Sequence, residues 1–157
     1  MQQMVMYEED FKRIREVCDK LLRDANARVV FVVDRNGQLI ASSGETRGLD
    51  TTSLASLAAG NMATTIAMAK VLHEEEFTTQ FHEGKNLHIH IQIVGKRVIL
   101  VVVFDNRSSL GLVRLRVKKA SQELNQIFED IIARIQKESM SPFADITDED
   151  IDNLFND

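Results

Sequence analysis

The chain has 157 residues, of which 44% are hydrophobic, and this suffices for one domain whose core needs neither a disulfide nor a metal. The net charge is −5, but residues 139–157 hold six acids and no Lys or Arg, which leaves 18 acids and 19 bases in residues 1–138. Neither part has the dense basic cluster of a nucleic-acid-binding protein, and the single cysteine, Cys18, excludes a disulfide within the chain.

The chain begins with an amphipathic helix and a hairpin. Over residues 7–24, apolar side chains recur at helical spacing with charged residues between them. Residues 29–33 are too short and too β-branched for a helix, so we predict a buried strand there. The segment Asp34–Gly37 predicts a tight turn, because its Asn and Gly tolerate positive φ. Residues 39–43 should therefore return as an antiparallel strand.

A second helix is predicted over about residues 53–73, with Asp50 or Thr51 as its cap. The helix is apolar nearly all round, with alanines at four-residue spacing on one stripe and larger side chains opposite. The stripe also suits packing on the protein's own sheet, but an all-round apolar helix is typically covered on more than one side. Gly60 costs about 1 kcal/mol relative to Ala in a helix interior, which also indicates an offsetting contact. We expect a helix that binds a partner or a second copy. The expected dimer interface consists of Ala55, Ala59, Met62 and Ile66.

Three strands and a last helix complete the pattern. Residues 77–83 and 87–94 predict two strands, the second strictly alternating, and a two-residue turn leads to residues 98–104. That last run is apolar on both faces, so it should be the central strand. The final helix is predicted over about 109–137. The order α-β-β-α-β-β-β-α predicts an α+β fold, a five-stranded, mostly antiparallel sheet with helices on both faces.

The sequence contains no catalytic motif. No Gly-rich segment ends in Gly-Lys-Ser/Thr, and no G-x-S-x-G elbow is present. Cys18 has no histidine nearby in the sequence, and its spacing places it on the buried face of the first helix. The strand–helix alternation of a nucleotide-binding α/β fold is absent. We therefore predict no catalytic residue, no metal and no cofactor. The sequence has no signal-type opening segment and no apolar run near 18 residues, so we expect a cytoplasmic protein.

Three histidines leave one alternative open. His88 and His90 lie two residues apart on a strand and therefore share a face, which is one way to chelate a metal. His82, on the neighbouring strand, could approach them. Because no second close-spaced pair completes four ligands, a polar strand face or an interface is the favoured interpretation.

The acidic tail has a pattern of its own. We expect a domain over residues 1–138, a flexible break at Ser139–Pro142 and a short amphipathic helix over about 148–156. Thr147 is its expected cap, and acids in the first turn suit the helix dipole. A helix this short is not stable alone, so the segment is predicted to dock on a partner. The side chains expected to dock are Phe143, Ile146, Ile151, Leu154 and Phe155.

The element order and several segments together resemble the Roadblock family, which includes certain dynein light chains and GTPase-regulating scaffolds. The resemblance covers essentially the whole chain. Its segments are Val5–Glu9, Asn36–Ile40, Asp50–Leu57, Phe81–Gly84, Asp105–Arg107, Ser109–Arg116, Ser141–Ala144 and Asp150–Phe155.

The resemblance is strongest to bacterial members of this family, and it implies a homodimer that activates a Ras-like small GTPase of the MglA type. Such a protein has no active site of its own and repositions the catalytic residues of the GTPase, without an arginine finger. It controls cell polarity and motility and is concentrated at a cell pole. The implied contacts are Ala63, Thr64 and Ala67 on the second helix, Arg114, Lys118 and Lys119 on the last helix, and the tail side chains named above. The chain departs from the family at Thr64, Thr65 and Ile66, which are bulkier than the small residues expected there.

Two further functions remain alternatives to GTPase activation. One is a scaffold that binds the GTPase without accelerating hydrolysis. The other is a small-ligand or metal-binding sensor that uses His82, His88 and His90.

Overall fold

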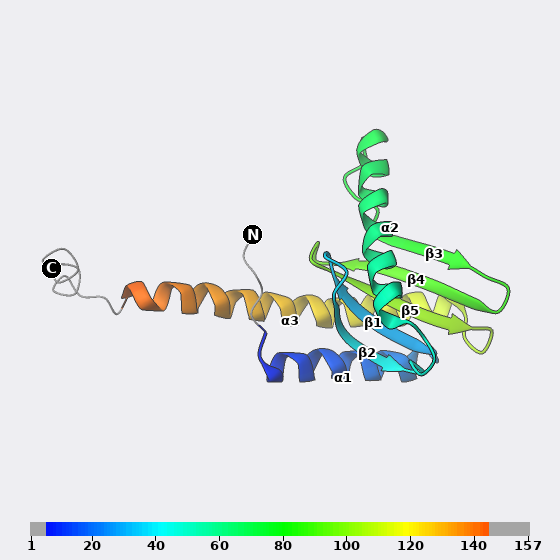
Figure 1. Cartoon of the computed structure of the whole chain (residues 1–157), viewed down its shortest axis with the longest axis horizontal. Coiled ribbons are helices and arrows are strands. Elements are labelled where there is room, and N and C mark those ends of the chain that lie inside the picture. The colour runs from blue at the N-terminus through cyan, green and yellow to red at the C-terminus, as the bar shows by residue number, and fades with distance from the viewer. Residues whose placement is uncertain (1–5, 145–157) are drawn as a thin grey trace, which may run out of the picture.

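The computed structural model describes residues 6–144, with side chains as far as Ser139. Within this range the elements follow the predicted order α-β-β-α-β-β-β-α (Figure 1). The elements are α1 (Glu8–Asp24), β1 (Val29–Asp34), β2 (Leu39–Gly44), α2 (Thr51–Val71), β3 (Thr79–Glu83), β4 (Leu87–Val94), β5 (Val98–Asp105) and α3 (Leu110–Ala144).

The five strands form one sheet in the order β2-β1-β5-β4-β3, and every neighbouring pair is antiparallel. Strand β5 lies in the middle, as the apolar run over residues 98–104 predicts, and β2 and β3 are the edges. The turn between β4 and β5 is formed by Gly95 and Lys96, which both have positive φ. Two central residues with positive φ match the right-handed twist of the strands that they join.

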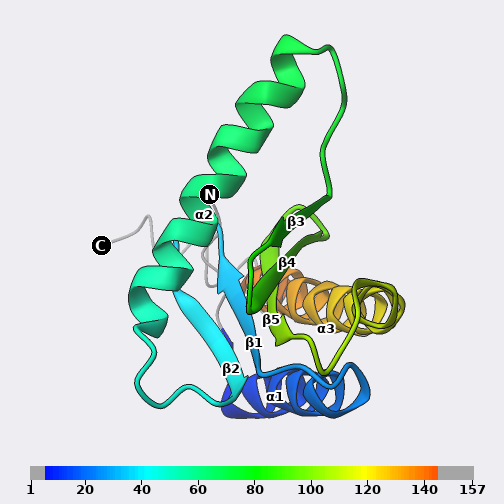
Figure 2. The same ribbon diagram turned by 90° about the vertical axis from the view of Figure 1, so that its right-hand side faces the viewer.

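Helices cover the two faces of the sheet unequally (Figure 2). Helices α1 and α3 lie on one face, whereas α2 alone crosses the other. The alternation of β5 separates the two cores: Leu100 and Val102 pack with α1 and α3, and Ile99 and Val101 pack with α2. Cys18 is fully buried in the α1–α3 core, as its helical spacing predicts.

Both ends of α2 are fixed by local hydrogen bonds. The Asp50 carboxylate accepts a bond of 3.0 Å from the backbone N–H of Ser53, so Asp50, rather than Thr51, is the cap. At the other end, His73 adopts a φ of +60°, and the N–H of Glu74 donates to the carbonyl of Ala69 over 2.9 Å. This left-handed closure ends the helix at Val71, two residues before the expected end. The acidic run 74–76 therefore lies outside the helix.

Helix α3 is longer than expected. It was predicted to end near residue 137, but it continues to Ala144 and so includes Ser139–Pro142, where a break was expected. A proline beyond the first turn removes one backbone donor and crowds the carbonyl four residues earlier, yet the helix continues past Pro142. The tail predictions at Ile146, Ile151, Leu154 and Phe155 lie outside the described residues, and the domain boundary at residue 138 remains a prediction.

Candidate functional site

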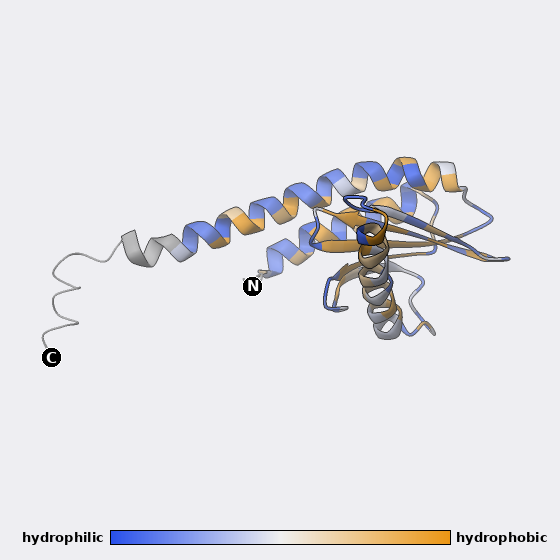
Figure 3. Ribbon diagram, turned by 90° about the horizontal axis from the view of Figure 1, so that it is seen from above, coloured by the Kyte–Doolittle hydropathy of each residue, from blue (hydrophilic) through white to orange (hydrophobic). Residues whose placement is uncertain are grey.

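The outward face of α2 is exposed and largely apolar. The exposed fractions of Leu57, Met68, Val71 and Leu72 are 69%, 54%, 78% and 64%. Lys70 is the only charged side chain of this helix. In Figure 3, α2 is coloured mostly neutral or hydrophobic, whereas α1 and α3 alternate between hydrophilic and hydrophobic. The exposed residues are Thr52, Ser53, Ser56, Leu57, Gly60, Ala63, Thr64, Ala67, Met68, Lys70 and Val71.

The predicted GTPase contacts on α2 lie on this face. Ala63, Thr64 and Ala67 are all exposed, and they occupy adjacent turns of the helix. The Thr64 hydroxyl donates to the carbonyl of Gly60 over 3.2 Å, so its polar atom is turned back on the helix. At these three positions the surface consequently has only small side chains, and it is nearly free of charge. Of the three bulkier residues in the sequence, only Thr64 lies on it, since Thr65 is buried and Ile66 is half-buried.

The predicted dimer residues lie on the opposite side of α2. Ala55 and Met62 are only 1% and 3% exposed, because they pack on the sheet of the same chain. Ala59 and Ile66 are half-buried and contact the same core. The four residues thus seat the helix within the protomer. A dimer that uses α2 has to use the exposed face of this helix instead. Helical periodicity alone does not predict which face is exposed, because both faces are apolar.

The predicted contacts on α3 are not brought together with those on α2. Arg114, Lys118 and Lys119 are exposed, but α3 covers the other face of the sheet. The structure therefore presents two separate candidate surfaces, an apolar one on α2 and a basic one on the first half of α3. Phe143 belongs to the last turn of α3, and its side chain lies outside the described part.

The histidines do not form one cluster. His88 and His90 share the α3 side of the sheet, but His82 pairs with Ile89 and points to the α2 side, so it does not approach them as a metal site of three histidines would need. The Nδ1 atom of His88 accepts from the N–H of Gly84 at 3.3 Å, and its Nε2 atom lies 3.0 Å from Oδ1 of Asn106. Among residues 6–144, no three metal-ligating side chains come together.

His90 and Cys18 are buried rather than poised for chemistry. Burial, and to a smaller degree the Arg114 cation, lower the pKa of His90 from 6.5 to about 4. Burial, with a smaller contribution from Asp19, raises the pKa of the Cys18 thiol to about 12. A neutral imidazole and a protonated thiol inside the α1–α3 core are structural groups.

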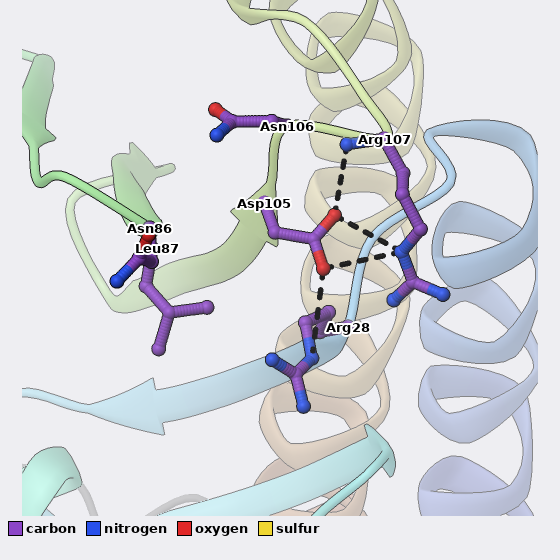
Figure 4. Close-up of a pocket in the computed structure, with 6 residues that line it drawn as sticks. All are labelled: Arg28, Asn86, Leu87, Asp105, Asn106 and Arg107. Atoms are coloured by element: carbon purple, nitrogen blue, oxygen red, sulfur yellow. Dashed lines mark hydrogen bonds and ion pairs between the residues drawn. The ribbon is translucent and has the colours of Figure 1, made fainter.

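An open pocket of about 590 Å³ lies where β1 begins and β5 ends. In Figure 4, the guanidinium groups of Arg28 and Arg107 approach the Asp105 carboxylate from two sides. The distances are 3.9 Å from Arg28 Nε and 3.1 Å from Arg107 Nε, and Arg28 also reaches Glu45 at 2.8 Å. Hydrogen bonds from Arg107 lower the pKa of Asp105. The cluster joins strand ends and the loop before α3, and its charged side chains pair with one another.

Strand β3 supplies a feature that the sequence analysis missed. It is an edge strand of only five residues, so the backbone groups along its outer side have no neighbouring strand in the part of the chain that the structure describes. An unpaired edge is a template for pairing with another chain. The end of α2 rises past the sheet, and the loop of residues 72–78 returns from it to the start of β3 (Figure 2). Whether a strand lies at an edge depends on the order of the strands in the sheet. The local sequence pattern does not predict that order.

Among the described residues, no helix is both long enough and apolar enough to cross a membrane.

A family model and several similar solved structures identify the family of this chain. Residues 13–104 match the model described as the Roadblock/LC7 domain. The chain is similar to Myxococcus xanthus MglB, with 62% identity and a TM-score of 0.77, over 81% of this chain and 96% of that one. It is similar to the gliding protein MglB from Thermus thermophilus, with 34% identity and a TM-score of 0.76, over 83% and 98%. A structure described as MglB with a tetrameric arrangement gives 32% identity and a TM-score of 0.77, over 83% and 98%. Curated proteins gave no match.

Proposed function

The chain belongs to the Roadblock/LC7 family, and on this premise we propose that it is a homodimeric activator of a Ras-like small GTPase of the MglA type. It accelerates GTP hydrolysis by the bound GTPase and thereby controls cell polarity and motility from a cell pole. The relatives that support this proposal are two MglB proteins, one of them described as a gliding protein.

The observation that carries the proposal is the exposed face of α2. Ala63 and Ala67 project only methyl groups, so another protein can approach the helix backbone closely. Exposed apolar side chains such as Leu57 and Met68 flank this low stripe, and burying them on a partner is favourable by about 25 cal/mol per Å². Large exposed apolar patches mark binding sites more often than ordinary surface.

The composition of this face also supports the type of activation. Lys70 is the only charged residue on α2, so the face offers neither a carboxylate base nor a guanidinium for the developing charge on the phosphate. A surface without such groups contributes shape and rigidity. The chemistry then belongs to the GTPase, whose own catalytic residues are repositioned when its loops rest on α2.

The dimer is proposed to form on the same side of the molecule. The outer edge of β3 offers backbone groups that no neighbouring strand pairs in the described part of the chain, and Val71 and Leu72 at the end of α2 offer exposed apolar area. Pairing two β3 edges in a symmetric dimer satisfies the backbone groups and places two α2 helices on one surface. The relative with a tetrameric arrangement is consistent with self-association in this group.

The test is single-turnover hydrolysis by the GTP-loaded GTPase with and without the full chain. We expect acceleration of at least about tenfold, which corresponds to about 1.4 kcal/mol of barrier. Binding without acceleration identifies a scaffold instead. Light scattering checks the dimer, and a monomer of 17.8 kDa at micromolar concentration contradicts that part of the proposal. Clear binding of free GTP to the chain alone contradicts the assignment of all chemistry to the GTPase.

A further inference from the structure

One hydrogen bond connects α2, whose exposed outer face is called the platform below, to the edge strand β3. Thr65 is the only polar residue among the buried residues of α2. Its hydroxyl donates to the carbonyl of Asn61 over 2.9 Å and accepts a hydrogen bond from the side-chain amide of Gln80 in β3. Gln80 faces α2 because its register partner, Ile91, belongs to the core on that side of the sheet.

The position of this bond matters because the second half of α2 has few buried contacts with the rest of the protein. Beyond Ala69 no residue of the helix is buried, and residues 70–75 are all exposed. Figure 2 shows this end of α2 rising past the sheet. The buried contacts of this half of the helix come from Met62, Thr65 and Ala69. Methyl contacts resist separation but do little to fix rotation, whereas a hydrogen bond is directional.

The contact between this half of α2 and the sheet also includes buried polar groups. The Oδ1 atom of Asn61 is buried and has no hydrogen-bond partner in the part of the chain that the structure describes. A buried acceptor that has lost its water and gained no donor lowers the stability of the folded state. The contact formed by Asn61, Thr65 and Gln80 therefore orients α2 on the sheet but lowers the stability of the folded state.

We propose that the Gln80–Thr65 hydrogen bond is a positioning contact that holds the second half of α2 at the angle required for GTPase activation. The same turns carry Ala63 and Ala67 on their outer side, so rotation of the helix displaces the docking surface. Because Gln80 lies on β3, the contact also links the proposed dimer strand to the proposed platform. The inference rests on the proposed function, and it concerns the rate of hydrolysis at saturation rather than affinity.

The test compares variants that remove this hydrogen bond with little change in side-chain size and a control variant that removes a different hydrogen bond of β3. Thr65→Val removes the hydroxyl, Gln80→Met removes the amide donor at similar length, and Thr65→Ser keeps the hydroxyl. The control is Thr79→Val, because Thr79 on the same strand donates to Gln92 over 2.8 Å on the face away from α2. Each full-length variant is assayed for single-turnover rate at saturation and for the concentration that gives half the effect.

We expect Thr65→Val and Gln80→Met each to lower the saturating rate about three- to tenfold with little change in half-saturating concentration. The double variant should be no slower than either single variant, since one interaction is lost in all three. Thr65→Ser and Thr79→Val should resemble the unmodified chain. Equal effects of Thr65→Val and Thr79→Val, or additive losses in the double variant, overturn the inference.

Amide hydrogen exchange gives a readout that does not depend on activity. Thr65→Val should increase exchange in residues 62–71, and Thr79→Val should not. If the unmodified chain fails to accelerate hydrolysis, the proposed function has failed and exchange alone decides the inference. Unchanged exchange in 62–71 then rejects it.

Discussion

The two faces of the sheet are closed by different kinds of packing. On one face, α1 and α3 bury large side chains such as Ile14, Leu124 and Phe128, none of which is more than 2% exposed. Ion pairs also join these two helices, including Arg134 to Asp10 at 2.8 Å. On the other face, α2 sits on the sheet mainly through alanine side chains and leaves its outer side open. Large buried side chains are therefore concentrated on one face, and the exposed apolar surface of α2 lies on the other.

This division follows from what each kind of surface can do. Large complementary side chains fill a core to crystal-like density and resist change. Small side chains let backbones approach closely, but they bury little area each, so a helix seated on them is stabilised less. An activator needs a rigid base and an accessible platform, and the sheet separates the two. Changes on one face should then affect folding, and changes on the other should affect binding.

The largest expected effect is the loss of stability after Leu124→Ala. Leu124 is fully buried between α3 and the sheet, so truncation removes apolar contacts and leaves a cavity. We expect a loss of about 2–5 kcal/mol in the free energy of unfolding. Leu57→Ala on α2 is the matched control, because Leu57 is 69% exposed and should cost less than about 1 kcal/mol. Denaturant unfolding measures both, and similar losses contradict the division between faces.

The converse experiment places a large cation on the platform. Ala63→Arg or Ala67→Arg should weaken GTPase binding by about a hundredfold, because the long side chain holds the partner away from the helix. Both positions are exposed, so the free energy of unfolding should change by less than about 0.5 kcal/mol.

Ala133→Arg provides the control for these two variants. Ala133 is an exposed alanine on α3, where the same change should leave binding unaltered. Calorimetric titration of the GTP-bound GTPase measures the three variants. Normal binding by both α2 variants moves the docking site to another surface.

A pH effect should be confined to the α1–α3 face. His90 is only 1% exposed, and its lowered pKa of about 4 means that the folded state binds fewer protons than the unfolded state between pH 6.5 and 4. Stability should therefore be full above pH 6.5 and fall as the pH drops through this window, by about 1–3 kcal/mol. His90→Leu should flatten the curve measured by unfolding at each pH. An equally steep curve for His90→Leu assigns the effect to other groups.

Much of this fold was predictable because its signals are local. The alternation of residues 87–94, the apolar run at residues 98–104 and the Asp50 cap each determine their element without help from distant segments. Helix ends were less predictable. The end of α2 depends on the left-handed φ of His73, and histidine is not a usual signal for that conformation.

The candidate site was only partly predictable, because it depends on which face of α2 meets the sheet. Ala55 and Ala63 have the same side chain, yet one is buried and the other exposed. The placement of His82 opposite Ile89 rather than beside His88 and His90 follows from the strand register, which a single sequence does not give. The GTPase contacts themselves came from family resemblance, and they remain predictions for this chain.

The smallest expected effect concerns the acidic end of the chain. Helix α3 continues to Ala144, so removal of residues 145–157 leaves it whole while removing all six acids of the tail together with Ile146, Ile151, Leu154 and Phe155. We expect about tenfold weaker GTPase binding at low salt, with the saturating rate of hydrolysis retained because the platform remains. The acids should make this contribution salt-sensitive, since charges separated by more than about 8 Å are screened at physiological ionic strength.

Two full-length variants separate the sources of this effect. Replacing the six tail acids by their amides should remove the salt sensitivity and part of the affinity. Replacing Ile151, Leu154 and Phe155 by serine should remove the remainder at every salt concentration, because apolar burial is not screened. Unchanged affinity after the truncation rejects a docking role for the tail. Complete loss of acceleration at saturation instead makes the tail, rather than α2, the element that activates the GTPase, and the contrast between the two faces of the sheet no longer accounts for function.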